Sequence, residues 1–377
     1  MRRMRWAWMV LWVLLSQGCT SYIAGKIVRP EPDPFFANMG DVLQPAGFAR
    51  DTAVTAQQVH LSYWIASPHD YRFEGRFDED PRHPVLHYQL SQPASASHAL
   101  PVRGSVVLLH PIGESGMTMG DWGIRFAASG YTVVMPDLRS HGQSDPAPLG
   151  FGAREAVDIA DLVAQLRRAG RLPDPLYLLG VSYGGSVALY AAHDVPDVRA
   201  VVALEPFGNV AKTIERAPGT GLFGHPWLVR WIATPSRMRK ATALAGRRLG
   251  LNLDAIDTGD AVSRLRVCAL LMRGQADTLV EAADVQAMRQ RSAYAQLRQV
   301  DGESHIWLPI RTDRLFAPVL AWMQAARPGE ASSCPAAPAI APLSTVTASP
   351  AAHTTVSGPA ATASPAPAAS APATARR

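Results

Sequence analysis

Cysteine is scarce in this chain: Cys19, Cys268 and Cys334 are the three among 377 residues. Three cysteines do not make a disulfide scaffold, and no Cys/His cluster has the spacing of a metal site. Cys268 lies in an apolar run and Cys334 in a polar, proline-rich tail. We therefore predict a fold that does not rely on cross-links, with a Cys268–Cys334 disulfide left open as the alternative, and we predict no bound metal.

The apolar run at the N-terminus is short. "WAWMVLWVLL" spans residues 6–15, about half of the 20 residues that a membrane-spanning helix needs. It follows the basic "MRRMR" and precedes "SQGC". This order of basic, apolar and small residues is typical of a secretory signal, so we predict a signal peptide over residues 1–18.

The end of that segment, "LSQGC", resembles a bacterial lipobox. Gly18 directly precedes Cys19, although Ser16 and Gln17 replace the commoner residues. The resemblance implies that Cys19 is the lipidated first residue of the mature chain, and several acyl chains, at about 0.8 kcal/mol per buried methylene, make a stable anchor. Because Thr20 follows and not an aspartate, similarity to lipoprotein sorting signals implies the outer membrane, facing the periplasm. Ordinary cleavage and an uncleaved anchor are the alternatives.

Sequence motifs of nucleic-acid binding are also lacking. The formal net charge of +5 comes partly from the ends, where Arg2, Arg3 and Arg5 stand at the start and Arg376 and Arg377 at the finish. The sequence has no zinc-finger spacing, no RNA-binding aromatic motif and no basic helix with heptads. We expect no nucleic-acid partner.

Both ends of the chain are poor in core-forming residues. Residues 328–377 are almost wholly Ala, Pro, Ser and Thr, a composition that cannot bury a core, so we predict that they are disordered. Residues 19–56 include the stiff "RPEPDPFF". We predict that they form a tether between the lipid and a folded domain over 57–327.

Strand-like and helix-like stretches alternate within that domain. Continuous apolar runs such as "GSVVLLHP" and "LYLLGV" are typical of strands buried on both faces. Strands alternating with helices predict a doubly wound, mostly parallel α/β sheet of eight strands. Two runs at the front, 58–66 and 85–91, mix polar with apolar residues and are expected to pair antiparallel. The other expected strands are 104–111, 131–137, 176–181, 198–207, 265–274 and 295–302.

An insertion over residues 207–262 breaks the alternation. It contains no convincing strand and carries eight Lys or Arg against four acidic residues. We predict a helical lid over the carboxyl ends of the strands, where open α/β sheets bind ligands. The alternative is a packing elaboration with a solvated basic face.

A serine stands in the abrupt turn between a buried strand and a helix, in "GVSYG" at 180–184. A turn this tight needs small residues two before and two after the serine, and Gly180 and Gly184 meet that need. The turn aims the hydroxyl at the end of the sheet, beside a helix N-terminus that favours negative charge. The pattern predicts that Ser182 is a nucleophile; the alternative is a glycine-rich turn with an incidental serine.

A serine hydroxyl needs a base, and the base needs an orienting acid. The order expected in a fold of this kind is Ser, then acid, then His. Asp277 follows one predicted strand and His305 follows the next, so both leave the sheet at the same edge as Ser182. We predict the catalytic triad Ser182–His305–Asp277. Glu205, at the end of the strand after the elbow, is the rival acid.

With these features the chain resembles the α/β-hydrolase superfamily, over roughly residues 57–326. The matching stretches are "GVSYGG", "RGQADTLV", "GESH", "PDLRSHGQSD" and "LLHPIGESG". The resemblance implies an α/β-hydrolase fold with a helical lid. It also implies that the backbone N–H groups of Ile112 and Tyr183 form an oxyanion hole, in which losing one donor typically costs about 3 kcal/mol. The family usually has His-Gly where this chain has His110-Pro111.

The resemblance further implies two-step transfer of an acyl group from a small-molecule ester, with no metal or organic cofactor. Ser182 argues against the dehalogenase and epoxide hydrolase branches, which use a carboxylate nucleophile. A peptidase or amidase with Glu114 or Glu205 binding a substrate amine remains an alternative. So does an acyltransferase or a cofactor-free haloperoxidase on the same triad, and so does a non-catalytic binding lipoprotein.

Overall fold

The computed structural model describes residues 18–30, 39–70, 72–78, 85–91, 100–220, 232–327 and 329–341. All of these residues belong to one compact unit, residues 1–343. Residues 1–17 of the predicted signal peptide, residues 221–231 of the predicted lid and the tail from residue 342 onward lie outside the described residues.

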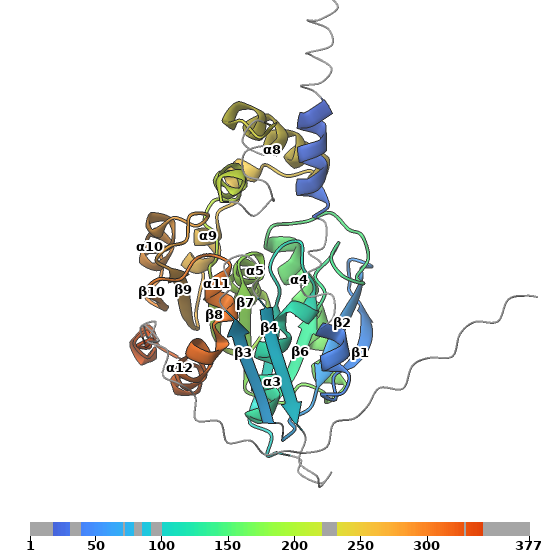
Figure 1. The fold of residues 1–377 in the computed structure, drawn as a ribbon, viewed down its shortest axis with the longest axis vertical. Helices are drawn as coiled ribbons and strands as arrows, with labels where there is room; N and C mark the ends of the chain where they lie inside the picture. The colour runs from blue at the N-terminus through green and yellow to red at the C-terminus, as the bar shows by residue number, and fades with distance from the viewer. Residues whose placement is uncertain are drawn as a thin grey trace, which may run out of the picture. The chain divides into compact units, whose positions relative to one another are not determined.

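Eight strands form the main sheet, in the order β1-β2-β6-β5-β7-β8-β9-β10 (Figure 1). Every pair from β6 to β10 is parallel, whereas β1 and β2 run antiparallel at one edge. The predicted doubly wound, mostly parallel eight-stranded sheet is therefore confirmed. The strands are β1 (Ala49–Val54), β2 (His60–Ala66), β5 (Gly104–Leu109), β6 (Tyr131–Pro136), β7 (Leu176–Val181), β8 (Val198–Leu204), β9 (Cys268–Gly274) and β10 (Ala295–Val300).

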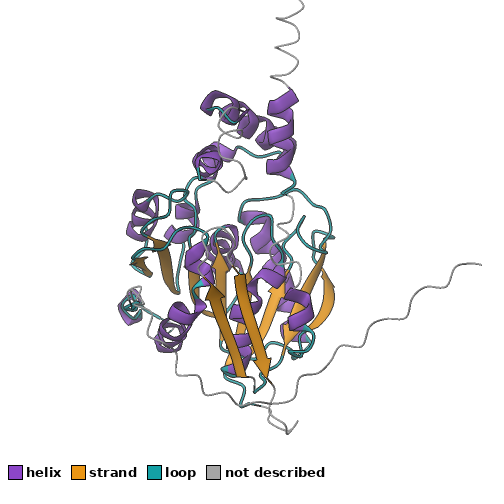
Figure 2. Cartoon of the chain, viewed as in Figure 1, coloured by secondary structure: helices purple, strands orange, loops and turns teal. Residues whose placement is uncertain are grey.

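Helices cover both faces of this sheet (Figure 2). Alternate residues of a strand point to opposite faces, so in β5 Val106 and Leu108 join one core and Val107 and Leu109 the other. Because every residue of β5, β6, β7 and β9 is buried, these strands read as continuous apolar runs in the sequence. One face carries α4 (Ala153–Arg168), α5 (Tyr183–Asp194) and α10 (Ala282–Gln290), and the other carries α3 (Gly120–Ala128) and α12 (Thr312–Ala325).

The predicted pairing at the front of the chain is wrong. β2 pairs with β1, while β4 (Val85–Ser91) pairs with β3 (Arg72–Asp78) in a separate two-stranded sheet. The sequence did not predict β1 or β3 because neither strand has an apolar run: β1 reads "ARDTAV" and β3 reads "RFEGRFD". The folded domain consequently begins before residue 57, at β1 or earlier.

The predicted irregular tether over 19–56 is also wrong in part. Residues 18–28 are helical, and α2 (Met39–Leu43) follows. Ala24 is fully buried, and Ile23, Ile27 and Val28 pack against the same core. Apolar residues at this spacing lie on one face of a helix, a signal that the adjacent proline-rich stretch obscured. Within the described ranges, each helix is too short or too polar to cross a membrane.

The described part of the predicted lid is helical. It comprises α6 (Val210–Arg216), α8 (Pro235–Leu249), α9 (Thr258–Ser263) and two short 3-10 turns. α8 begins at the cap Thr234, whose hydroxyl accepts from the N–H of Arg237, and ends at Gly250 in the left-handed conformation. Among residues 207–220 and 232–262 no strand forms. Covering of the site by this insertion stays a prediction.

Residues 329–341, which we call the C-terminal strap, pack along α12, so the predicted disorder from residue 328 is wrong for them. The indole N–H of Trp322 donates to the Pro335 carbonyl at 3.1 Å. The guanidinium of Arg314 donates to the Ala341 carbonyl at 3.2 Å. Ile340 packs against the core of that face. A low-complexity composition hid a short segment with enough apolar contact to be ordered.

A disulfide joins Cys268, at the start of β9, to Cys334 of the strap. The expectation of a fold without cross-links is thus corrected. The sequence separation of 66 residues corresponds to roughly 4 kcal/mol of loop-closure stabilisation in the chain-entropy model. The two cysteines meet because the strap returns along the sheet face that Cys268 occupies, a route that the sequence pattern alone does not specify.

Candidate active site

Ser182 stands at the junction of β7 and α5 in a strained backbone conformation, with φ +51° and ψ −110°. A positive φ is uncommon for a residue with a side chain and is found where the surrounding structure enforces it. The N–H of Ser182 donates to the Leu204 carbonyl of the neighbouring strand at 2.7 Å. The side chain is therefore held at the carboxyl edge of the sheet.

Two glycines make this turn sterically feasible. A Cβ added to Gly180 would lie 2.0 Å from the carbonyl oxygen of Gly184. A Cβ added to Gly184 would lie 2.1 Å from the Leu109 carbonyl oxygen at the end of β5. The sequence-based requirement for small residues on both sides of Ser182 is met in the structure by direct backbone contact.

Asp277 lies in the loop after β9, and its carboxylate orientation is fixed by the backbone. Oδ1 accepts from the N–H groups of Leu279 at 2.7 Å and Val280 at 2.9 Å. The buried guanidinium of Arg273 donates to the carbonyls of Asp277 and Val280, at 2.7 and 2.8 Å. Oδ2 is thereby left to face another partner.

His305 lies in the loop after β10, and this loop is tied to the Asp277 loop. The N–H of Gln275 donates to the Val300 carbonyl, and that of Ala276 donates to the Glu303 carbonyl, each at 2.8 Å. The buried carboxylate of Glu303 is in turn paired with Arg314 of α12. The two loops are therefore held in a fixed mutual position.

The three predicted side chains meet. His305 Nδ1 lies 2.8 Å from Asp277 Oδ2, and His305 Nε2 lies 3.0 Å from Ser182 Oγ. With Asp277 ionised, Nδ1 carries the proton and Nε2 is free to accept the hydroxyl hydrogen of Ser182. This geometry can activate a serine for attack on an electrophilic carbon.

The loop after β5 lies against the serine turn. The predicted oxyanion donors, the N–H groups of Ile112 and Tyr183, donate to no acceptor in the described part of the chain. His110 anchors the loop: Nε2 accepts from the Leu138 N–H at 2.9 Å, and Nδ1 lies 2.8 Å from the Pro111 carbonyl. Burial, reinforced by a neighbouring histidine, lowers the pKa of His110 well below its ordinary value, so the ring is neutral.

Asp137 organises the same loop and was not singled out from the sequence. Its buried carboxylate accepts from the N–H of Gly116 at 2.7 Å and of Gln143 at 2.8 Å, and it pairs with Arg50. A Cβ on Gly142 would lie 2.3 Å from that carboxylate. The stretch "PDLRSHGQSD" contained this residue, but nothing local marks which of its aspartates is buried.

A model described as the alpha/beta hydrolase family matches residues 106–327, more than half of the 377 residues. This chain is an α/β hydrolase. The match begins in β5 and ends just after α12, so it contains the serine turn and the Asp277 and His305 loops. The α/β-hydrolase fold predicted from the sequence is confirmed.

Curated relatives of the hydrolase are distant. The 30 kDa subunit of magnesium chelatase from Rhodobacter capsulatus is 27% identical over 258 residues, which cover 59% of this chain and 88% of that protein. A soluble epoxide hydrolase from Corynebacterium sp. is 39% identical over 72 residues, 19% of this chain and 23% of that protein. Among solved structures, the Pyrococcus furiosus esterase Pf2001 superposes with a TM-score of 0.53 at 18% identity, covering 79% of this chain and 94% of that one. At this identity the superposition shows the fold.

The hydrolase has a second buried carboxyl beside the three meeting side chains. Glu205 follows β8 with φ +53° and is fully buried, and its Oε1 accepts from the Gly274 N–H at 2.7 Å. Its Oε2 receives no hydrogen bond from a described donor. One ligand atom each of Glu205, Asp277 and His305 lie within 4.8 Å of one another.

Two carboxyl groups this close disfavour each other's ionisation. Burial, together with the adjacent Asp277, raises the pKa of Glu205 well above its ordinary value. Burial opposes ionisation of Asp277 too, but its neighbours, the hydrogen bond with His305 first among them, outweigh burial and hold the pKa of Asp277 below its ordinary value. Of the two carboxyls, Asp277 is therefore the one whose ionisation the site favours, and ionisation of Glu205 is disfavoured, as the opposite directions of the two pKa shifts show.

Glu205→Gln should change how stability depends on pH. A carboxyl whose pKa is raised on folding stabilises the native state below its unfolded pKa, and that contribution is lost as pH rises from the ordinary value of 4.5 towards the raised one. Glutamine is neutral throughout, so relative to wild type the variant should gain about 1.4 kcal/mol of unfolding free energy per pH unit across that window. Urea unfolding at a series of pH values measures this difference in the free energy of unfolding. If the free energies of the two proteins changed with pH in parallel, Glu205 would be ionised in the native state.

Proposed function

We propose that the hydrolase is a serine hydrolase of carboxylic esters, held in the bacterial cell envelope by lipid on Cys19. The observation that carries the catalytic part is the hydrogen-bonded series from Ser182 Oγ through the His305 ring to Asp277, at 3.0 and 2.8 Å. The strained turn at Ser182 supports it, because strain of this kind concentrates at functional sites.

In the first half-reaction, His305 Nε2 takes the hydroxyl proton as Ser182 Oγ bonds to the acyl carbon. The tetrahedral oxyanion accepts hydrogen bonds from the N–H groups of Ile112 and Tyr183. His305 Nε2 then gives its proton to the leaving alkoxide oxygen, the bond from acyl carbon to that oxygen breaks, and the alcohol departs. Asp277 stabilises the imidazolium that exists between these proton transfers.

In the second half-reaction, water replaces the alcohol. His305 Nε2 takes a proton from water as the hydroxide oxygen bonds to the acyl carbon. The tetrahedral intermediate collapses, the bond to Ser182 Oγ breaks, and the proton on His305 returns to Oγ. The free acid leaves, and the site is restored without a metal or organic cofactor.

Other reactions considered for these residues require other groups or another acyl acceptor. A peptidase that holds a substrate amine with Glu205 is disfavoured, since that carboxyl is fully buried and burial with the adjacent Asp277 raises its pKa well above the ordinary value. Epoxide hydrolysis is disfavoured by a serine in the position where that branch has a carboxylate. An acyltransferase would use the same three residues and differs only in the acceptor, which we take to be water.

Labelling and turnover together test this proposal. A fluorophosphonate probe should attach to Ser182 of the wild-type protein, located by mass spectrometry of the labelled peptide. A panel of p-nitrophenyl esters of increasing chain length should be hydrolysed faster than matched peptide anilides. Absence of labelling, with no hydrolysis of any ester, would favour a non-catalytic binding lipoprotein. Release of acyl product only when an alcohol acceptor is supplied would favour a transferase.

The anchoring part is supported by the sequence around Cys19 and by the Cys268–Cys334 disulfide, since disulfides persist in oxidising compartments outside the cytosol. Cys19→Ser should abolish incorporation of an alkyne-tagged palmitate in the producing bacterium, because the thiol that receives the diacylglycerol is gone. Labelling followed by in-gel detection measures it. Ser182→Ala is the matched control and should be labelled like wild type. Continued labelling of the Cys19→Ser protein would contradict the lipid anchor.

A further inference from the structure

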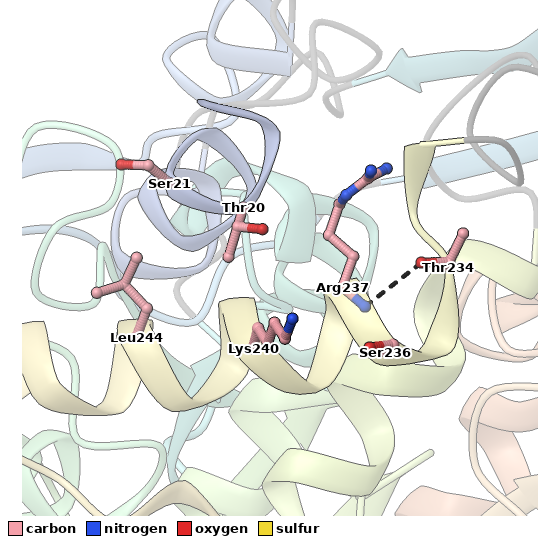
Figure 3. A pocket seen from close by; sticks show the side chains of 7 residues that line it. All are labelled: Thr20, Ser21, Thr234, Ser236, Arg237, Lys240 and Leu244. Carbon is pink, nitrogen blue, oxygen red and sulfur yellow. Dashed lines mark hydrogen bonds between the residues drawn. The ribbon is translucent and has the colours of Figure 1, made fainter. Parts of the chain in front are cut away.

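A groove lies between helical residues 18–28 and α8, next to the predicted lipid site (Figure 3). Its volume is about 540 Å³, within the range of small-molecule sites. None of its described lining residues is acidic, and none is Ser182, Asp277 or His305. The lining consists of Thr20, Ser21, Thr234, Ser236, Arg237, Lys240 and Leu244.

The charges on the groove are of one sign. α8 carries five basic residues and no acidic one, and two of the five, Arg237 and Lys240, line the groove. Within the described part of the chain neither of these two side chains pairs with a carboxylate, and the Arg237 guanidinium donates through one nitrogen to the Ile232 carbonyl. Lys240 is exposed. Two cations flanked by hydroxyl donors are the groups that bind the oxygens of a phosphate.

The groove is a built part of the domain. The helix over 18–28 is fixed to the body by the fully buried Ala24 and by Ile23 and Ile27 in the core. Arg248 of α8 donates to the Ser21 hydroxyl at 2.6 Å and to the Ser21 carbonyl at 3.1 Å. These contacts join the two walls of the groove to each other and to the domain.

The position of the groove in the chain sets its height above a membrane. Thr20 directly follows Cys19, and one residue spans at most about 3.6 Å, so lipid on Cys19 would place Thr20 and Ser21 at the level of the phospholipid headgroups. Tyr22 is 65% exposed, and tyrosine favours that interface. This step rests on the lipid anchor of the proposed function.

We propose that this groove binds the phosphodiester headgroup of an anionic phospholipid and so seats the hydrolase on the membrane to which it is tethered. Lys240 and Arg237 hold the phosphate oxygens, and the hydroxyls of Ser236 and Thr20 lie where the polar head of the lipid emerges. Leu244 meets the glycerol end. The tether alone leaves the domain free to rotate, whereas occupation of the groove gives it one orientation.

The test uses the full lipidated chain in vesicles of phosphatidylcholine, with or without phosphatidylglycerol. Hydrogen exchange of residues 234–244 is followed by mass spectrometry. Phosphatidylglycerol should slow exchange there about tenfold, the order expected for two cations at an anionic surface. Arg237→Gln/Lys240→Gln should remove the slowing. Arg239→Gln/Arg247→Gln, an equal charge loss on the same helix outside the groove, should retain it.

The outcomes separate this proposal from the one on which it rests. Equal loss of protection in both double variants would show a diffuse charge effect and overturn the groove. Equal protection by inorganic phosphate on phosphatidylcholine vesicles would show a site for free anions and overturn the lipid ligand. Wild-type protein that does not remain with either vesicle would overturn the anchor, and the seating with it. Hydrolysis of a short ester, unchanged in both double variants, verifies that they are folded.

Discussion

Ser182→Ala is expected to lower kcat/KM for a p-nitrophenyl ester by about 10⁴- to 10⁶-fold. The variant lacks the oxygen that bonds to the acyl carbon, and its residual rate comes only from bound water and the oxyanion donors. The fold should persist because, among the residues that the structure describes, the Ser182 side chain has one hydrogen-bond partner, His305 at 3.0 Å. Steady-state kinetics, with thermal unfolding as a check of the fold, measures the effect.

Ser186→Ala is the matched control for that substitution. Ser186 lies one helical turn further along α5, is fully buried, and has its hydroxyl 3.5 Å from the Phe207 carbonyl. Its loss should leave kcat/KM within a few-fold of wild type. A Ser182→Ala protein with normal turnover would mean that hydrolysis occurs elsewhere in the chain, and the proposed mechanism would be wrong.

Asp277→Asn should lower kcat by about 10³- to 10⁴-fold, because it favours the His305 tautomer that cannot act as a base. The backbone N–H groups of Leu279 and Val280 require an acceptor at Oδ1, so the asparagine oxygen stays there and its NH₂ turns to His305. Nδ1 must then accept, the ring proton moves to Nε2, and Nε2 can no longer take the proton of Ser182. Turnover measured over a range of pH, beside unfolding curves, checks this effect.

Glu205→Gln is the control for the acid assignment. Glu205 makes no hydrogen bond to His305 among the described residues, and a glutamine can still accept from the Gly274 N–H, so kcat should stay within about tenfold of wild type. The reverse result, an active Asp277→Asn and an inactive Glu205→Gln protein, would make Glu205 the orienting acid.

The parts of the fold that the sequence predicted are those with a local signature. Strands buried on both faces leave apolar runs, and the turn at Ser182 requires Gly180 and Gly184 whatever the rest of the chain does. Asp277 and His305 could be placed because each follows a parallel strand, and the carboxyl ends of parallel strands share one edge of the sheet. The order Ser, then acid, then His along the chain assigned their roles.

The parts that the sequence did not predict depend on distant contacts. β1 is a strand because it pairs with β2, since "ARDTAV" has little apolar character of its own. The raised pKa of Glu205 depends on burial and on Asp277 close by, and these two residues are far apart in the chain. The helix over 18–28 is ordered by packing against the body, and its neighbouring prolines indicated the opposite.

The C-terminal strap matters to anyone who shortens this chain. A cut after residue 327, where the composition turns to alanine and proline, would strip the edge of α12, leave Arg314 without the Ala341 carbonyl and convert Cys268 into an unpaired thiol. A cut after residue 341 keeps all three features. The engineering boundary of the domain thus lies at the far end of the strap, beyond both the change in composition and the covalent bond at Cys334.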